Sequence, residues 1–215
     1  TVKPGEIVGL IGTNGAGKST LMNAISGFVP STGTIEIFGT EAHDRSAPRR
    51  ARLGIGRAFQ NARLFSSLSV RETLMVALEA RESSLLVPSM LSLPPSPQRE
   101  KRKHKQANEI IGYLGLSRYA DSLLGELSTG TRRIVELGAL LALDSELLLL
   151  DEPTAGMSNS ETSRFIDLIR EVTVGKTLLT VEHDMGVVFG LADKIAVVVY
   201  GEVLAFDTPD AVRAN

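Results

Sequence analysis

Residues 12–20 read GTNGAGKST and follow directly on the apolar run of residues 7–11. The segment fits the phosphate-binding pattern G-x-x-x-x-G-K-[ST]. Its glycines allow the backbone to turn tightly against phosphate oxygens, and the helix that follows adds the positive end of its dipole. The alternative is a glycine-rich turn before an ordinary helix, but strand, loop and helix occur here in the order that phosphate binding requires. We therefore predict an α/β fold built around a nucleotide-binding loop.

Each polar residue of this loop has a predicted role. Lys18 is placed to reach the β- and γ-phosphates, and the hydroxyl of Ser19 is placed to ligate Mg²⁺ in the first turn of the helix. The predicted nucleotide-binding residues of the loop are Gly12, Asn14, Gly15, Gly17, Lys18, Ser19 and Thr20.

Composition limits the classes of protein to which the chain can belong. A chain of 215 residues with 43% hydrophobic residues is long enough for one domain with an inserted lobe. A net charge of −2 argues against nucleic acid as a partner. The absence of cysteine excludes disulfides and thiolate metal sites, and it fits the cytoplasm. The longest stretch without charge, residues 83–98, holds four prolines and therefore cannot form a membrane-spanning helix.

The pattern of apolar residues divides the chain into three parts. Residues 33–39 and 57–60 are predicted to be strands, with a short arginine-rich helix at about 48–53 between them. Residues from 61 to about 143 are predicted to be mainly helical, with a loop at 83–98 and a helix from 99 to about 114. We expect one domain, with a nucleotide-binding core at about 1–60 and 144–215 and a helical subdomain at about 61–143.

Residues 99–105 form a basic cluster with the sequence REKRKHK. One interpretation is a solvated helical face, and the other is a patch that touches acidic lipid head groups or a partner. We favour the solvated face. The short length of the cluster and its glutamate argue against a nucleic-acid site.

Residues 147–150 are four consecutive leucines that end in Asp151-Glu152-Pro153. This pattern predicts a buried parallel strand with carboxylates at the edge of the sheet where ligands bind. Asp151 is suited to hold Mg²⁺ through water, and Glu152 is suited to polarise the attacking water as general base. The alternative, a simple polar turn, is disfavoured by the phosphate loop upstream.

Two further polar residues end predicted strands. Residues 177–181 are predicted to form the next buried strand, which is followed by Glu182 and His183, while Gln60 ends the strand at 57–60. A glutamine can ligate a metal or orient water, and a histidine can contact the γ-phosphate. Alone, each would be structural, and only the set as a whole favours a catalytic site. After a helix at about 160–172, a strand at 195–199 is predicted to turn into a terminal hairpin that ends near residue 206.

Residues 127–131 read LSTGT and open a predicted helix with the apolar stripe Ile134, Leu137, Gly138 and Leu141. Ser128 is the expected N-cap, and an ordinary capped helix is the simplest interpretation. Ser128 and Gly130 at an exposed helix start also make an anion site, the second one in this chain. Two such sites in one chain suggest a nucleotide shared between two copies.

The ordered set of residues 12–20, Gln60, 127–131, 147–152 and His183 resembles the ATP-binding subunits of ABC transporters over nearly the whole chain. The resemblance implies a P-loop NTPase fold with a RecA-like parallel sheet core and an inserted α-helical subdomain. It implies that Lys18 and Ser19 belong to Walker A, Gln60 to the Q-loop, Ser128 and Gly130 to the signature and Asp151 to Walker B. Glu152 would be the catalytic glutamate and His183 the switch histidine, with ATP and Mg²⁺ as ligands and with Ser19, Gln60 and Asp151 at the metal.

The same resemblance implies partners. Two subunits, identical or paralogous, would sandwich two ATP molecules, each between one Walker A and the opposite signature. Transmembrane permease subunits would hold the pair at the cytoplasmic face of the membrane, and a substrate-binding protein would act indirectly. We expect the segment 60–69 to contact the permease, because it links the nucleotide site to the helical lobe.

A narrower resemblance is to the ATPase subunits of branched-chain amino-acid importers. It rests on residues 54–60, on the proline-bearing insert before Arg99, on residues 151–156 and on residues 181–185. The alternatives are an ABC ATPase of another transporter or a soluble ABC-type ATPase that is not coupled to transport. A GTPase is disfavoured, because no Asn-Lys-x-Asp motif for guanine is present.

Three features depart from the family pattern. Thr129 and Thr131 replace the first glycine and the glutamine of the signature, and Ser158 replaces the aspartate of the loop after Walker B. The chain begins at Thr1 without methionine, and we expect the first antiparallel strands of the family and the aromatic residue that stacks on adenine to lie upstream. The chain by itself is therefore expected to bind ATP weakly.

Overall fold

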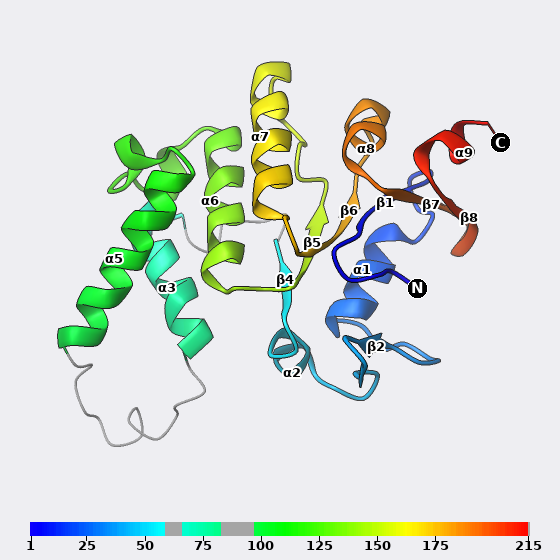
Figure 1. Cartoon of the computed structure of the whole chain (residues 1–215), viewed down its shortest axis with the longest axis horizontal. Coiled ribbons are helices and arrows are strands. Elements are labelled where there is room, and N and C mark those ends of the chain that lie inside the picture. The colour runs from blue at the N-terminus through cyan, green and yellow to red at the C-terminus, as the bar shows by residue number, and fades with distance from the viewer. Residues whose placement is uncertain (59–65, 83–96, 215) are drawn as a thin grey trace. The chain divides into compact units, whose positions relative to one another are not determined.

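The computed structural model describes residues 1–58, 66–82 and 97–214 (Figure 1). The chain divides into two compact units. The first contains residues 1–60, 145–155 and 162–215, and the second contains residues 61–144 and 156–161. Across the described ranges, no helix combines the length and the apolar character needed to span a membrane.

The first unit is built on a six-stranded sheet with the order β4-β5-β6-β1-β7-β8. Neighbouring strands are parallel except for β7 and β8, which form an antiparallel hairpin (Figure 1). The strands are β1 (Ile7–Ile11), β4 (Ile55–Arg57), β5 (Leu147–Asp151), β6 (Thr177–Val181), β7 (Lys194–Val199) and β8 (Glu202–Asp207). All five residues of β6 and the last four of β5 are buried, because continuous apolar runs suit strands covered on both faces. The predicted parallel core is confirmed.

The helices of the first unit follow its strands. They are α1 (Lys18–Ser26), α2 (Ala47–Ala51), α8 (Met185–Leu191) and α9 (Pro209–Arg213), together with α7 (Asn159–Val172), whose first three residues belong to the second unit. Phe165 and Ile169 of α7 are buried, whereas Ile166 and Leu168 are only half-buried.

Two predicted strands differ from the structure. The expected strand at 33–39 is wrong in its extent, because Phe38 and Gly39 both adopt positive φ angles and turn the chain. A short hairpin of β2 (Glu36–Ile37) and β3 (Thr40–Glu41) results. The strand expected at 57–60 begins earlier, as β4 at Ile55, and pairs with β5. Gln60 lies outside the described residues.

The second unit is helical. It contains α3 (Val70–Glu82), α5 (Pro97–Tyr113), α6 (Thr129–Ala142) and the short 3₁₀ turns η2 (Ser117–Tyr119) and η3 (Leu124–Glu126). The predicted stripe of α6 faces its core, with Ile134, Leu137 and Gly138 buried and Leu141 half-buried. Gly138 allows a close approach, because a Cβ there would lie 2.8 Å from Leu114 Cδ1.

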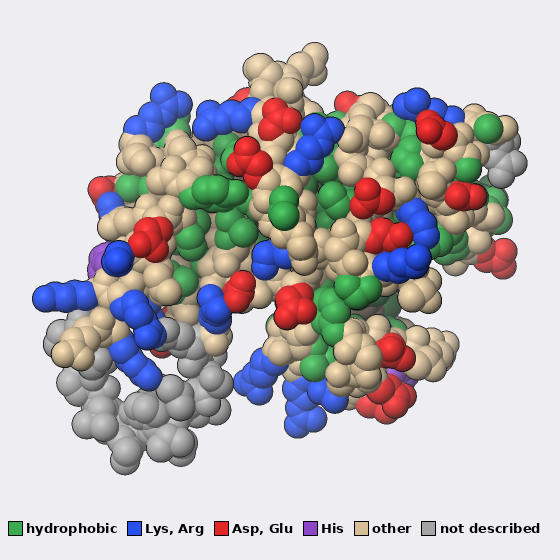
Figure 2. All heavy atoms as spheres, in the orientation of Figure 1, with side chains coloured by type: hydrophobic (Ala, Val, Ile, Leu, Met, Phe, Trp, Pro, Cys, Tyr) green, Lys and Arg blue, Asp and Glu red, His purple; other side chains and the backbone are tan. Residues whose placement is uncertain are grey.

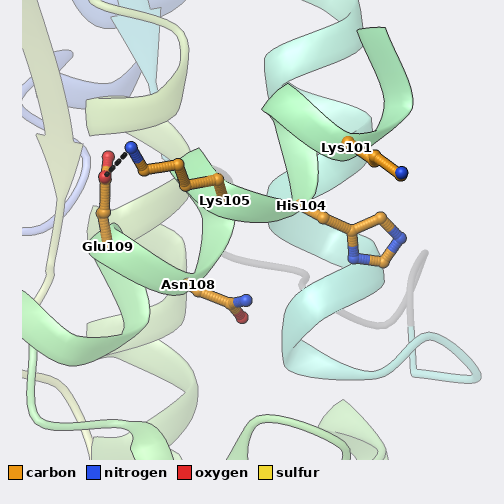
Figure 3. Close-up of a pocket in the computed structure, with 5 residues that line it drawn as sticks. All are labelled: Lys101, His104, Lys105, Asn108 and Glu109. Atoms are coloured by element: carbon orange, nitrogen blue, oxygen red, sulfur yellow. Dashed lines mark ion pairs between the residues drawn. The ribbon is translucent and has the colours of Figure 1, made fainter. Parts of the chain in front are cut away.

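The basic cluster lies on α5. Figure 2 shows lysine and arginine side chains gathered over this helix. Lys101, His104 and Lys105 are exposed around a shallow hollow, where Lys105 pairs with Glu109 at 3.8 Å (Figure 3). Their exposure agrees with the favoured interpretation, a solvated face. Lys103 differs, because it is buried and forms an ion pair with Glu79 of α3.

Candidate active site

A cleft of about 780 Å³ in the first unit brings together residues that lie far apart in the sequence. One side is the phosphate loop and the start of α1, and the other is formed by the residues that follow β5 and β6. The lining residues are Asn14, Gly15, Ala16, Gly17, Lys18, Ser19, Thr20, Glu152 and His183. Eight of these nine, all but Ala16, are predicted site residues.

The backbone of the loop has a shape that only glycine allows at two positions. A Cβ on Gly12 would lie 2.0 Å from the carbonyl oxygen of Val198, so no side chain fits there. Gly17 is the N-cap of α1 with φ +99°, and no side chain caps the helix. The first N–H groups of α1 therefore remain available to an anion at the positive end of the helix dipole.

Lys18 is held in place by the loop itself. Its Nζ donates to the carbonyl oxygens of Gly12 at 2.8 Å and Thr13 at 3.0 Å, and the residue is only 6% exposed. An ammonium group has three donors, so these two bonds orient it and leave one N–H for a phosphate oxygen. The lysine is pre-organised to neutralise phosphate charge.

Asp151, at the end of β5, has the features of a residue that receives a cation. Its Oδ1 is buried and has no hydrogen-bond partner among the described residues. Its Oδ2 lies 3.7 Å from Nη2 of Arg57, and burial lowers the pKa of Arg57 while the charge of Asp151 opposes that shift. A buried carboxylate oxygen without a donor costs free energy unless a cation or water reaches it. This oxygen and the Ser19 hydroxyl are the hard ligands that Mg²⁺ prefers.

Glu152 and His183 are in direct contact. His183 Nε2 and Glu152 Oε1 lie 2.8 Å apart, at hydrogen-bond distance, and the two side chains are 46% and 31% exposed. Glu152 does not continue the strand, because it adopts φ +49° and turns the chain at the end of β5. The pair thus faces the cleft at a turn rather than along a strand.

Ser128 and Gly130 belong to the second unit, at the N-terminus of α6. Ser128 is the N-cap as predicted, since its Oγ accepts from Thr131 N at 3.2 Å. The cleft of the first unit has no lining residue from this helix start.

Sequence reasoning missed three polar residues next to these sites, namely Thr154, Glu161 and Glu182. Glu182 is 3% exposed and accepts two hydrogen bonds from Thr154. Glu161 places a carboxylate beside Gly130 and Ser128. For Glu182 a signal was available, namely a charged residue directly after five buried strand residues.

Comparison with known protein families gives a match to the family described as ABC transporter over residues 1–155. The chain is 36% identical to the high-affinity branched-chain amino acid transport ATP-binding protein LivG of Escherichia coli K12, covering 99% of this chain and 84% of LivG. It is 32% identical to BraF of Pseudomonas aeruginosa, a protein of the same description, covering 100% of this chain and 85% of BraF. It is also 32% identical to the ribose import ATP-binding protein RbsA of Oceanobacillus iheyensis, over 92% of this chain and 38% of RbsA.

Solved structures give the same result. A nucleotide-free ATP-binding cassette from an ABC transporter superposes with a TM-score of 0.84 at 26% identity, covering 99% of this chain and 85% of that one. The ADP conformation of the ATP-binding cassette MJ1267 superposes with a TM-score of 0.80 at 26% identity, covering 96% and 82% of the two chains.

Proposed function

The chain belongs to the ABC transporter family of ATPases, and from this premise we propose that it powers an importer of branched-chain amino acids. ATP binding and hydrolysis coupled to transport follow from membership of the family. The observation that carries the ATPase part of the proposal is the cleft in which the phosphate loop faces Glu152 and His183. The resemblance to LivG and BraF over nearly the full chain supports the choice of solute.

We propose that the phosphate loop binds the triphosphate of ATP. The N–H groups at the start of α1 would receive the phosphate oxygens, and Lys18 would neutralise the β- and γ-phosphates. Ser19, Asp151 and Gln60 would hold Mg²⁺, directly or through water, although Gln60 lies outside the described residues. When bound, Mg²⁺ supplies charge neutralisation between the phosphates.

Hydrolysis needs a group that takes a proton from the attacking water. We assign this role to Glu152, whose carboxylate faces the cleft at the end of β5. His183 donates to that carboxylate at 2.8 Å when its Nε2 carries the proton, which orients Glu152. The imidazole would then lie beside the γ-phosphate of bound ATP. The two residues would then respond together to the loss of the γ-phosphate.

The start of α6 would complete the site in a second copy of the chain or in a paralogue. Ser128 and Gly130 would contact the γ-phosphate of the ATP bound to the partner's phosphate loop. In this arrangement the first unit is the nucleotide-binding core and the second is the helical subdomain. A permease would hold the pair at the cytoplasmic face of the membrane, and a substrate-binding protein would deliver the solute to the permease.

Uptake by cells of the source organism tests the choice of solute. Cells in which this chain carries Glu152→Gln should lose uptake of radiolabelled leucine, because the importer lacks its energy source. Uptake of radiolabelled ribose should stay at the wild-type rate. Normal leucine uptake together with lost ribose uptake would instead support the alternative solute class to which RbsA points.

A further inference from the structure

Glu182 is a buried acid that directly precedes His183, and the proposed function gives it no role. It follows the last residue of β6 and is 3% exposed. Its Oε1 accepts a hydrogen bond from the backbone N–H of Thr154 at 3.0 Å and another from the Thr154 hydroxyl at 2.8 Å. Thr154 is itself only 9% exposed. One buried carboxylate oxygen thus connects the end of β6 to the segment after β5.

The segment that Glu182 holds is the turn that carries Glu152. Glu152 adopts φ +49°, a left-handed conformation that is unfavourable for a residue with a Cβ atom. Its N–H donates to Val181 O at 2.8 Å, and its carbonyl oxygen accepts from Ala155 N at 3.2 Å. The two bonds from Thr154 come from the residue next but one to Glu152. Residues 152–155 are therefore fixed to the end of β6 at three points, two of them through Glu182.

We propose that Glu182 is a positioning residue of the ATPase, which fixes the turn at residues 152–155 so that Glu152 stays aimed at the cleft and at His183. The proposal rests on the role of Glu152 as general base, which belongs to the proposed function. Glu182 acts through Glu152 and does not touch the nucleotide. A base displaced by about 1 Å loses on the order of 100-fold in rate, so a small relaxation of this turn is enough to slow hydrolysis.

The role needs an oxygen that accepts two hydrogen bonds, and it does not need a charge. Burial raises the pKa of Glu182, while the hydrogen bonds from Thr154 and from the His183 backbone act in the opposite direction. The negative charge of Glu152 raises it further. Glutamine offers the same acceptor oxygen without a charge, so E182Q preserves the contact, whereas E182L has a similar volume and no acceptor.

Steady-state ATP hydrolysis by the full chain tests the proposal. We expect E182L to lower kcat by about tenfold or more while the KM for ATP changes by less than about twofold, because the phosphate loop is intact. E182Q should keep kcat within about twofold to threefold of the wild type. Circular dichroism and thermal unfolding check that each variant is folded.

If E182L does not fold, Thr154 supplies a second pair of variants. T154V removes the hydroxyl and keeps the backbone N–H, so it breaks one of the two bonds at nearly constant volume. T154S keeps both donors. T154V should lower kcat relative to the wild type, and T154S should keep wild-type turnover.

A double-mutant cycle separates positioning from a general structural effect. In single-turnover assays with radiolabelled ATP, E182L should cause no further loss of rate when Glu152 is already replaced in E152Q, because the group it positions is gone. An equal loss of rate in both backgrounds would overturn the proposal, and so would E182Q losing as much as E182L. Wild-type turnover by E152Q alone would instead remove Glu152 from the role of base, which is a failure of the proposed function.

Discussion

The start of α1 and the start of α6 both present backbone N–H groups, but the chain prepares them differently. At α1 the N-cap is Gly17, and no side chain caps the helix. Lys18 adds a positive charge that the loop carbonyls hold in place. At α6 the side chain of Ser128 already accepts from Thr131 N at 3.2 Å. The first start is open to an anion, and the second satisfies one of its donors by itself.

A carboxylate strengthens this contrast. Glu161 caps α7 together with Ser158, whose N–H and hydroxyl donate to its Oε2 at 3.0 and 2.8 Å. These hydrogen bonds, the backbone one first, lower the pKa of Glu161, so it is ionised at neutral pH. Its Oε1 lies 3.5 Å from Ser128 Oγ and 2.6 Å from where a Cβ of Gly130 would be.

The two helix starts have different roles. The start of α1 is ready to bind a phosphate within a single chain. The start of α6 has the negative charge of Glu161 beside it, and Ser128 already accepts from one of its N–H groups, so a phosphate gains less there. We infer that the start of α6 engages a nucleotide only after another copy has bound it.

The largest effect is expected at Glu152. Glu152→Gln keeps the shape of the side chain but cannot take a proton, so hydrolysis should slow by about 10²- to 10⁴-fold. ATP should stay bound at the α1 start and hold two copies together through the α6 starts. Single-turnover assays measure the rate of hydrolysis, and light scattering after size-exclusion chromatography in ATP measures whether the protein is a dimer. If the variant stays monomeric in saturating ATP, the claim that the α6 start engages the nucleotide of another copy is contradicted.

Next in size is the difference between Lys18→Ala and Ser128→Asp. Loss of the lysine should weaken Mg-ATP binding to the single chain by about 10- to 100-fold, because a charge-assisted hydrogen bond is worth roughly 1.5–3 kcal/mol. The substitution Ser128→Asp keeps the helix cap and adds a charge that repels phosphate. Because the start of α6 does not contact the nucleotide of its own chain in this account, Mg-ATP binding to the single chain should not change. Titration calorimetry compares the two variants. Equal losses would show that both starts contact the nucleotide in one chain.

A smaller effect is expected at Glu161. Glu161→Gln keeps the capping partner of Ser158 and removes the charge beside α6. In the Glu152→Gln background it should lower the ATP concentration needed for dimerisation by roughly two- to threefold, because a partly exposed charge acts weakly. Sedimentation velocity over an ATP series measures the shift. An unchanged or higher midpoint would mean that Glu161 does not oppose the phosphate.

The smallest expected effect is a dependence of the free energy of unfolding on pH, caused by Glu182 in the first unit. We expect no such dependence from Glu161 beside the α6 start. The folded pKa of Glu182 lies above that of the unfolded chain, so the folded state binds more protons between the two values. Its contribution to the free energy of unfolding is complete below about pH 4 and is lost as the pH rises through the folded pKa.

Glu182→Gln does not titrate at this position, so its stability relative to the wild type should rise as the pH rises above about 4. Urea unfolding at several pH values measures the difference. Glu161→Gln is the matched control, because the pKa of Glu161 is lowered and its replacement should not gain stability as the pH rises. A difference that is flat with pH would contradict the assignment for Glu182.

The sequence was sufficient for the features that local patterns encode. The buried strands at 147–151 and 177–181 were predictable because continuous apolar runs have few alternatives, and Ser128 was predictable as a cap because its neighbours follow helical spacing. The role assignments at Lys18, Glu152 and His183 remain predictions, although the structure places all three in one cleft.

Other features depend on contacts between distant segments and could not be predicted. The left-handed turn at Glu152 and the bonds from Thr154 to Glu182 arise only when β5 and β6 lie side by side. Lys103 looks like its basic neighbours in the sequence, yet it faces Glu79 of another helix. The strand β2 has only two residues because Phe38, which follows it, adopts a positive φ angle. A positive φ angle is uncommon for phenylalanine, so the sequence did not predict this turn.

Disulfide cross-linking tests most directly the central claim, that one nucleotide lies between the α1 start of one copy and the α6 start of another. The chain has no cysteine, so introduced cysteines report only on each other. In the Glu152→Gln background, chains with Asn14→Cys should be mixed with chains of a different tag length that carry Thr129→Cys. ATP should produce a cross-link between the two kinds of chain, and Lys18→Ala in the first kind should abolish it. Cross-linking that is the same with and without ATP, or that joins the Asn14→Cys chains to one another equally well, would contradict the account.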